Sequence, residues 1–144
     1  MFSDFHRAHE HLAAAVEGRL VADCGLALSR VEVLDVIAQL GTCRVNDIAE
    51  ELGITWGGTS KIVDRLEAAQ LCKRRPNPHD GRSSLIELTP MGSRSLTKAL
   101  KVMTSELADT VGSVLEESAL HQFSTSCRSL RQSTRGQTIA DLTA

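Results

Sequence analysis

Apolar side chains in the first half of the chain recur at steps of three and four and are interrupted by glycines. This spacing predicts four amphipathic helices. The first carries a stripe from Phe2 to Leu20 and ends at Gly25. Ser29 followed by Glu32 has the capping-box arrangement, which predicts that the second helix begins at that serine. The inward-facing residues of the later helices are expected to be Val33, Leu34, Ile37 and Ala38 in the second, Val45, Ile48, Ala49 and Leu52 in the third, and Ile62, Leu66 and Ala69 in the fourth.

The third and fourth helices, "VNDIAEELG" and "TWGGTSKIVDRLEAAQL", are separated by a short turn that contains a glycine. Such a pair is a helix-turn-helix candidate, with Thr55 as the N-cap of its second helix. Residues 72–75 and 83–89 are rich in strand-forming side chains, with two prolines and an Asp-Gly pair between them. This pattern predicts a β-hairpin directly after the helix-turn-helix.

The C-terminal part of the chain returns to helical spacing. Thr89 and Pro90 have the character of an N-cap and first residue of a long helix over 90–116, and Ser118 is expected to cap a last helix. The first helix and the C-terminal helices carry more apolar surface than the region between them can cover. We therefore expect these helices to pack on each other and on a second copy of the chain. The predicted fold class is mostly α (α+β): one domain over 1–144, with a winged helix-turn-helix region at 28–89 and helical homodimerisation segments at 1–27 and 90–135.

Composition narrows the class of protein. Hydrophobic residues make up 42% of the chain and charged residues 24%, as in ordinary globular proteins. No apolar run approaches the roughly 18 residues of a membrane span, and the N-terminus lacks a signal-peptide layout. We therefore expect a cytoplasmic protein without a membrane partner. The four cysteines form no C-x-x-C pair, which argues against a disulfide framework or a structural zinc cluster.

Charge is distributed unevenly along the chain. Residues 61–82 hold six basic and three acidic side chains, a net +3, so the remainder of a chain of net charge −2 carries −5. A basic face on an acidic body is the electrostatic footprint of nucleic-acid binding. The alternative is a solvated basic face without a partner. The basic cluster lies on a predicted helix-turn-helix and hairpin, and this position favours nucleic-acid binding over that alternative.

Helix-turn-helix geometry assigns roles to these residues. The start of the second helix can enter the major groove, and a hairpin arginine, here Arg82, suits the narrow minor groove. Asp80 is expected to hold the guanidinium of Arg82 in one orientation through a charge-assisted bond. Two adjacent glycines in the helix indicate either close backbone approach to DNA or a crowded helix contact. The residues expected to contact DNA are Trp56, Gly57, Gly58, Thr59, Ser60, Lys61 and Arg65 on the helix, and Arg74, Arg75, Arg82 and Ser83 on the hairpin.

The segment "IVDRLEAAQLCKRRPNPHDGRSSLIELTPMG", residues 62–92, resembles the signature of the MarR family of winged helix-turn-helix transcription regulators. The resemblance implies a homodimer on a pseudo-palindromic operator, with repression relieved by a small effector, metal or oxidant bound between the DNA-binding and dimer regions. Gln70 stands where the family usually has glycine, a position that calls for a left-handed backbone. The matching elements are Asp64-Arg65-Leu66, Leu71, Arg74, Asp80-x-Arg82 and Leu88-Thr89-x-x-Gly92.

We therefore expect a ligand-responsive transcription repressor that binds double-stranded DNA in a sequence-specific manner. Two alternatives remain open: a metal- or redox-sensing regulator of the same fold, or a winged-helix module that binds proteins. No catalytic constellation is evident, so we expect neither an enzyme nor a bound cofactor. The candidates for a regulatory metal are His6, His9, Glu10 and His11, and those for a redox thiol are Cys24 and Cys72.

Overall fold

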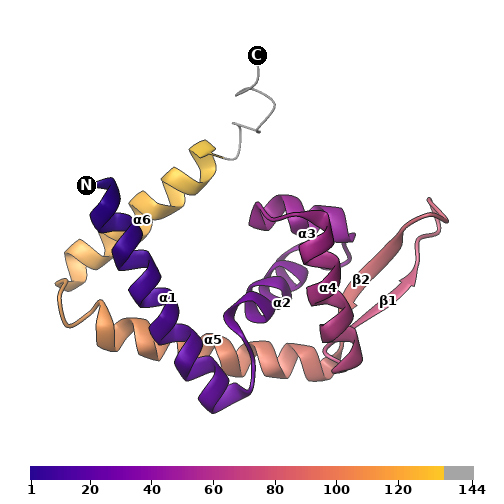
Figure 1. Ribbon diagram of the computed structural model, residues 1–144, viewed down its shortest axis with the longest axis horizontal. Coiled ribbons are helices and arrows are strands. Elements are labelled where there is room, and N and C mark those ends of the chain that lie inside the picture. Colours follow the sequence, from indigo (N-terminus) through magenta and orange to yellow (C-terminus); the bar gives the residue numbers. More distant parts are fainter. Residues whose placement is uncertain (135–144) are drawn as a thin grey trace. The chain divides into compact units, whose positions relative to one another are not determined.

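The computed structural model describes residues 1–134, and this part of the chain contains six helices and one antiparallel hairpin (Figure 1). The mostly α fold predicted from the sequence is confirmed. The chain divides into two compact units, Met1–Glu106 and a second that begins at Leu107. In chain order the elements are α1 (Phe2–Cys24), α2 (Leu28–Leu40), α3 (Val45–Leu52), α4 (Trp56–Ala68), β1 (Cys72–Pro76), β2 (Ser84–Leu88), α5 (Pro90–Thr110) and α6 (Glu117–Thr134).

One hydrophobic core holds the helix-turn-helix and the hairpin together in the first unit. Each of α2, α3, α4 and β2 contributes a side chain that is almost completely excluded from solvent. Burying each such side chain stabilises the fold by about 1.5–3 kcal/mol, so α4 and the hairpin are held against one framework. These residues are Leu34 and Ile37 of α2, Ile48 of α3, Leu66 of α4 and Ile86 of β2.

The hairpin pairs β1 and β2 in antiparallel register, from Cys72 opposite Leu88 to Pro76 opposite Ser84. A third short segment joins this sheet at Cys43, which exchanges two backbone hydrogen bonds with Ile86, at 3.1 and 2.7 Å. The sequence did not predict this bridge, because a single paired residue leaves no periodic pattern. This bridge connects the loop before α3 to β2 and so links the helix-turn-helix to the hairpin.

The joint between the hairpin and α5 forms as the sequence predicts. The Thr89 hydroxyl oxygen accepts the Gly92 N–H at 2.9 Å, which makes Thr89 the N-cap of α5. The Thr89 N–H in turn donates to the carbonyl oxygen of Leu71 at 3.1 Å. Gln70, beside this carbonyl, has φ 58 and is the one non-glycine with positive φ among the described residues. The left-handed backbone predicted at this position is confirmed.

The predicted start of α2 is wrong. The helix begins at Leu28, Ala27 occupies the N-cap position, and Ser29 lies inside the first turn without a side-chain capping bond. A carboxylate oxygen of Glu17, from α1, accepts the Leu28 N–H instead. An acceptor from a neighbouring helix therefore replaces the local serine.

The predicted ends of the C-terminal helices also need correction. Helix α5 ends at Thr110 and not at residue 116. The Val111 N–H still makes the helical bond to the Leu107 carbonyl, but the Gly112 N–H turns back to that same carbonyl and so leaves the helical pattern. Helix α6 begins at Glu117, so Ser118 lies within the helix and does not cap it. None of the helices in residues 1–134 combines the length and apolar character needed to cross a bilayer.

Candidate nucleic-acid interface

The first turn of α4 is exposed and carries few side chains. The Thr55 hydroxyl oxygen accepts the Gly58 N–H at 3.2 Å, which confirms the predicted N-cap. Trp56 is 61% exposed, and Gly57, Gly58 and Lys61 are exposed as well. A Cβ added at Gly57 would meet nothing within 4 Å, and one added at Gly58 would approach only the capping oxygen of Thr55, at 3.1 Å. Crowding against another helix therefore does not explain the glycine pair.

Thr59 does not belong to this exposed surface. Its side chain is fully buried, and its hydroxyl donates to the Thr55 carbonyl oxygen at 3.0 Å. The predicted DNA contact by Thr59 is therefore wrong, because the residue lies on the buried face of α4 with Val63 and Leu66. Ala69, predicted to face inward, is exposed because the helix has ended at Ala68, and Val63 fills the core position instead.

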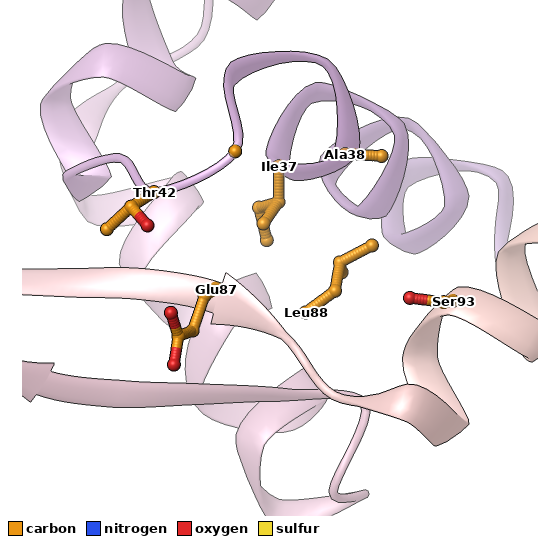
Figure 2. Close-up of a pocket in the computed structure, with 7 residues that line it drawn as sticks. Ile37, Ala38, Thr42, Glu87, Leu88 and Ser93 are labelled. Atoms are coloured by element: carbon orange, nitrogen blue, oxygen red, sulfur yellow. The ribbon is translucent and has the colours of Figure 1, made fainter.

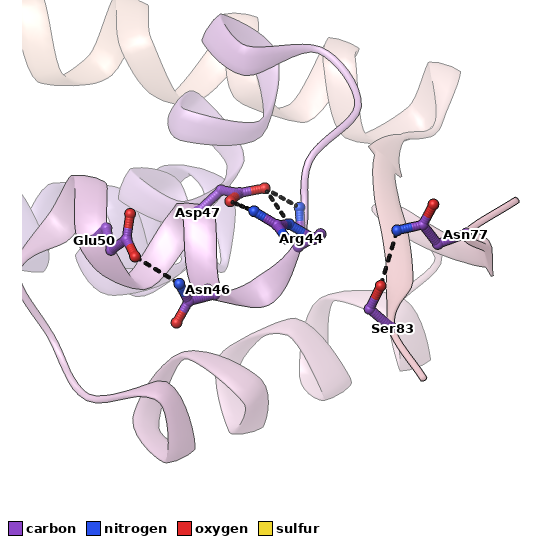
Figure 3. A network of polar contacts seen from close by, with 6 residues as sticks. All are labelled: Arg44, Asn46, Asp47, Glu50, Asn77 and Ser83. Atoms are coloured by element: carbon purple, nitrogen blue, oxygen red, sulfur yellow. Dashed lines mark hydrogen bonds and ion pairs between the residues drawn. The ribbon is translucent and has the colours of Figure 1, made fainter. Parts of the chain in front are cut away.

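The tip of the hairpin is held by side-chain hydrogen bonds to its own loop. The Asn77 amide nitrogen donates to the Ser83 hydroxyl oxygen at 2.9 Å across the loop (Figure 3). The Asn77 amide oxygen accepts the His79 N–H at 3.0 Å, and the Ser83 N–H donates to the Asp80 carbonyl oxygen at 3.1 Å. These bonds fix the loop conformation, with half-buried Ser83 inside the network.

Asp80 acts on the backbone of the tip and not on the arginine side chain. Its carboxylate accepts the backbone N–H of Arg82 at 3.0 Å, in an Asx-type turn. Within residues 1–134 no ion pair joins the carboxylate of Asp80 to the guanidinium of Arg82. The predicted charge-assisted bond is therefore wrong, although Asp80 still shapes the loop that carries Arg82.

Glu87 on β2 neutralises two of the hairpin's basic side chains. Its carboxylate lies 3.0 Å from the Lys73 ammonium and 3.5 Å from the Arg75 guanidinium. The register places Lys73 directly opposite Glu87 and Arg75 two residues further along the same face. The hydrogen bond from Lys73 is the main cause that lowers the pKa of Glu87. The charge of Arg75 is therefore partly neutralised by Glu87 on the neighbouring strand.

Arg74 joins the hairpin to α4. Its guanidinium donates to Glu67 at 2.6 Å and to Asp64 at 2.7 Å, and its side chain is 25% exposed. Partial burial lowers the pKa of Arg74, but the hydrogen bonds and charges of the two carboxylates outweigh it and the net shift is upward. The predicted DNA contact by Arg74 does not agree with this geometry, because both ends of the guanidinium are occupied by protein carboxylates.

Three basic side chains remain without an ion pair in this part of the chain. Among the described residues, Lys61, Arg65 and Arg82 are exposed and none lies within ion-pair distance of a carboxylate. Two come from successive turns of α4 and the third from the hairpin tip. Within the helix-turn-helix and the hairpin, the unpaired positive charge therefore lies on α4 and at the hairpin tip.

A further cation, missed in the sequence, lies at the start of α3. The Arg44 N–H and guanidinium both bond the Asp47 carboxylate, at 2.8 Å for the backbone and 2.8 Å for the shorter side-chain bond (Figure 3). These bonds raise the pKa of Arg44 and lower that of Asp47, and the charge of Asp80 adds to the shift at Arg44. The acidic residue three positions after Arg44 is the signal that could have identified Arg44 as the cap of this helix.

A pocket of about 370 Å³ lies beside the hairpin, between α2, β2 and the start of α5 (Figure 2). Ile37 and Leu88 face the space between α2 and β2, and Ser93 provides a polar group at its edge, whereas the carboxylate of Glu87 points away from this space (Figure 2). The remaining lining residues are Ala38, Gly41 and Thr42. The pocket borders Glu87, the residue that pairs with the basic side chains of β1.

The metal and redox candidates lie outside this interface. His6, His9, Glu10 and His11 are exposed on α1, and no group of three or more potential metal ligands occurs in the described part of the chain. Cys72 is buried, and burial raises the pKa of its thiol to about 11. Burial and the raised pKa of its thiol do not favour Cys72 as a redox thiol. All four cysteines are free, and Cys24 is half-buried.

Comparison with known proteins agrees with this architecture. Residues 26–84 match the MarR family. Over 64 residues the chain is 34% identical to the uncharacterised HTH-type transcriptional regulator YfiV of Bacillus subtilis (strain 168). This match covers 44% of the chain and 40% of that regulator.

Two solved structures extend the similarity to nearly the whole fold. Sco3205, a MarR family regulator from Streptomyces coelicolor in complex with DNA, has a TM-score of 0.80 and 20% identity over 92% of this chain and 84% of its own. BpsR of Bordetella bronchiseptica, whose DNA binding is regulated by 6-hydroxynicotinic acid, has a TM-score of 0.76 and 21% identity over 88% of this chain and 94% of its own. Fold and interface define a winged helix-turn-helix protein. Residues 26–84 are the part of the chain that matches the MarR family, and the likeness beyond them is one of fold.

Proposed function

We propose that the protein is a transcription regulator that binds double-stranded DNA in a sequence-specific manner. The observation that carries this proposal is the position of three exposed cations of α4 and the hairpin that have no ion pair in the described structure: Lys61 and Arg65 on α4 and Arg82 on the hairpin tip. An exposed helix that follows a short turn can enter the major groove, and a basic hairpin beside it can reach the adjacent minor groove. The DNA complex of Sco3205, which has the same fold, supports this assignment.

The interface divides into three roles. The start of α4, with Trp56, Gly57, Gly58, Ser60 and Lys61, meets base edges in the major groove. Arg65, one turn further, binds the phosphate backbone, and Arg82 enters the minor groove, with Arg75 and Ser83 at its flank. Arg74 and Asp80 position these groups from within the protein, through the contacts with α4 and the hairpin loop.

We propose a homodimer held by the terminal helices. Large apolar side chains on α1 and α6 remain more than half exposed, including Phe2, Phe5 and Leu130. A second copy can bury these surfaces and present two α4 helices to the two halves of a pseudo-palindromic site. The single helix-turn-helix of each chain makes such pairing the natural way to read an operator.

We further propose repression that responds to a small effector, for which the pocket beside β2 is the candidate site. BpsR, which shares the fold, has its DNA binding regulated by 6-hydroxynicotinic acid. Because the proposed partner is DNA, we assign the protein to the cytoplasm and give it no catalytic role.

Selection of bound sequences from a random duplex pool tests the proposal directly. The full chain should enrich a pseudo-palindromic consensus, and a mobility-shift titration with that duplex should show nanomolar binding, on the order of 10⁻⁸ M, by two chains per site. Failure to enrich any sequence, or binding equal on all duplexes, would contradict a sequence-specific regulator.

A further inference from the structure

The exposed first turn of α4 is apolar at its tip. Trp56, the chain's single tryptophan, is 61% exposed, and within the described residues its indole has no ring contact or hydrogen bond. Gly57 and Gly58 follow it without side chains. Thr59, the first residue after them that carries a hydroxyl, is buried and bonded to the Thr55 carbonyl.

Few polar groups are therefore left to read bases. Among residues 56–61, Ser60 is half-buried and Lys61 is exposed, and no amide or guanidinium group is present to make a bidentate bond to a purine. Arg65 lies one turn further along the helix. The exposed surface of this turn is an indole ring followed by bare backbone.

The chemistry of the major groove limits what such a surface can recognise. Each base pair displays hydrogen-bonding groups there, and the C5-methyl group of thymine is the one apolar group on offer. An indole ring can bury that methyl group. Glycines at 57 and 58 leave space for the close approach this requires, and inside the protein only the capping oxygen of Thr55 borders that space, at Gly58.

We propose, resting on the proposed function, that Trp56 is a specificity-determining residue that contacts the methyl groups of thymines at defined operator positions. Lys61, Arg65 and Arg82 hold the duplex by charge, and these exposed cations on α4 and the hairpin make an anionic duplex the fitting occupant of this surface. Operator sequence preference at these positions then depends mainly on an apolar contact.

Replacement of single thymines by deoxyuridine tests this inference, because the change removes only the methyl group. Each thymine of the selected operator is replaced in turn, and affinity is measured for the wild-type chain, W56A, W56F and the control M91A, which truncates an exposed apolar residue of α5. For wild type, one or two positions per half-site should lose about fourfold in affinity per methyl group. W56F and M91A should keep this discrimination, and W56A should bind the thymine and uracil duplexes equally.

Three results would overturn the inference. Wild-type affinity could be unchanged by every uracil substitution, W56A could keep the discrimination, or the selected operator could lack thymine within its half-sites. Each of these leaves DNA binding itself intact. If no duplex is bound at all, the proposed function fails, and the two failures are thereby distinguished.

Discussion

A methyl group at Gly92 would lie 1.8 Å from the carbonyl oxygen of Leu71. That carbonyl also accepts the N–H of Thr89, and the Thr89 hydroxyl caps α5 by accepting the Gly92 N–H. The end of the hairpin and the start of α5 therefore meet backbone to backbone. Glycine is required at position 92 because any side chain would enter the space of a hydrogen-bonded carbonyl.

Gly92→Ala should lower the free energy of unfolding by about 3 kcal/mol, since the neighbouring backbone must move to admit the methyl group. Urea unfolding followed by circular dichroism measures this loss. A variant as stable as wild type would show that the joint between the hairpin and α5 is loose.

Gly57→Ala should have the opposite effect on stability. A methyl group at Gly57 meets no atom within 4 Å, and alanine favours helix by up to about 1 kcal/mol. Operator affinity should nevertheless fall, because the added methyl group keeps the backbone from approaching the bases. Parallel unfolding and mobility-shift titrations compare the two effects. A more stable variant with unchanged affinity would mean that the helix does not need bare backbone at this position.

Gln70→Gly should raise the free energy of unfolding by up to about 1 kcal/mol. Gln70 holds φ 58, which is costly for a residue with a Cβ, and glycine relieves that cost while losing some chain entropy. Its side chain is exposed, so little packing is lost. Gln70→Val, tested alongside, should destabilise, because β-branching makes the left-handed conformation worse. Equal stability of the two variants would contradict a left-handed backbone here.

The buried thiols should be inert at neutral pH. Burial raises the pKa of Cys43 and of Cys72 to about 11, so both stay protonated where an ordinary thiol with pKa 9.0 begins to ionise. Iodoacetamide at pH 8 should modify half-buried Cys24 well before Cys43 or Cys72, as read by peptide mass spectrometry. Equal rates at Cys72 and Cys24 would contradict this assignment.

The same two thiols give a pH dependence of stability. Below pH 9 the thiols are protonated in both states and their burial costs no charge. As pH rises from about 9 to about 11, the unfolded thiols ionise first and the free energy of unfolding falls. Urea titrations at pH 8 and pH 10.5 measure this loss, and the double variant Cys43→Ala, Cys72→Ala should show a smaller one.

Local signals in the sequence predicted most of the fold. The stripe spacing, the stop at Gly25, the caps at Thr55 and Thr89 and the prolines of the hairpin loop each depend on residues close together in the chain. These features are short-range, so they can be recognised without knowing the tertiary structure. The left-handed backbone at Gln70 was predicted from the MarR resemblance, because that family usually has glycine at this position.

Contacts between distant segments account for the errors. Ser29 lost its predicted role to Glu17 of another helix, and Arg74 turned to carboxylates of α4 instead of solvent. Thr59 was buried because the core covers that face of α4. The pairing of Lys73 with Glu87 could have been predicted, since it follows once the hairpin loop sets the register.

The most direct test of the account is the affinity of Arg82→Ala for the selected operator, measured beside wild type as salt is raised. Arg82 has no ion pair in the described structure, so its removal should leave the fold and the dimer intact. We predict that the variant binds about tenfold or more weakly, with a shallower salt dependence than wild type. Affinity and salt dependence equal to those of wild type would contradict a hairpin that grips DNA.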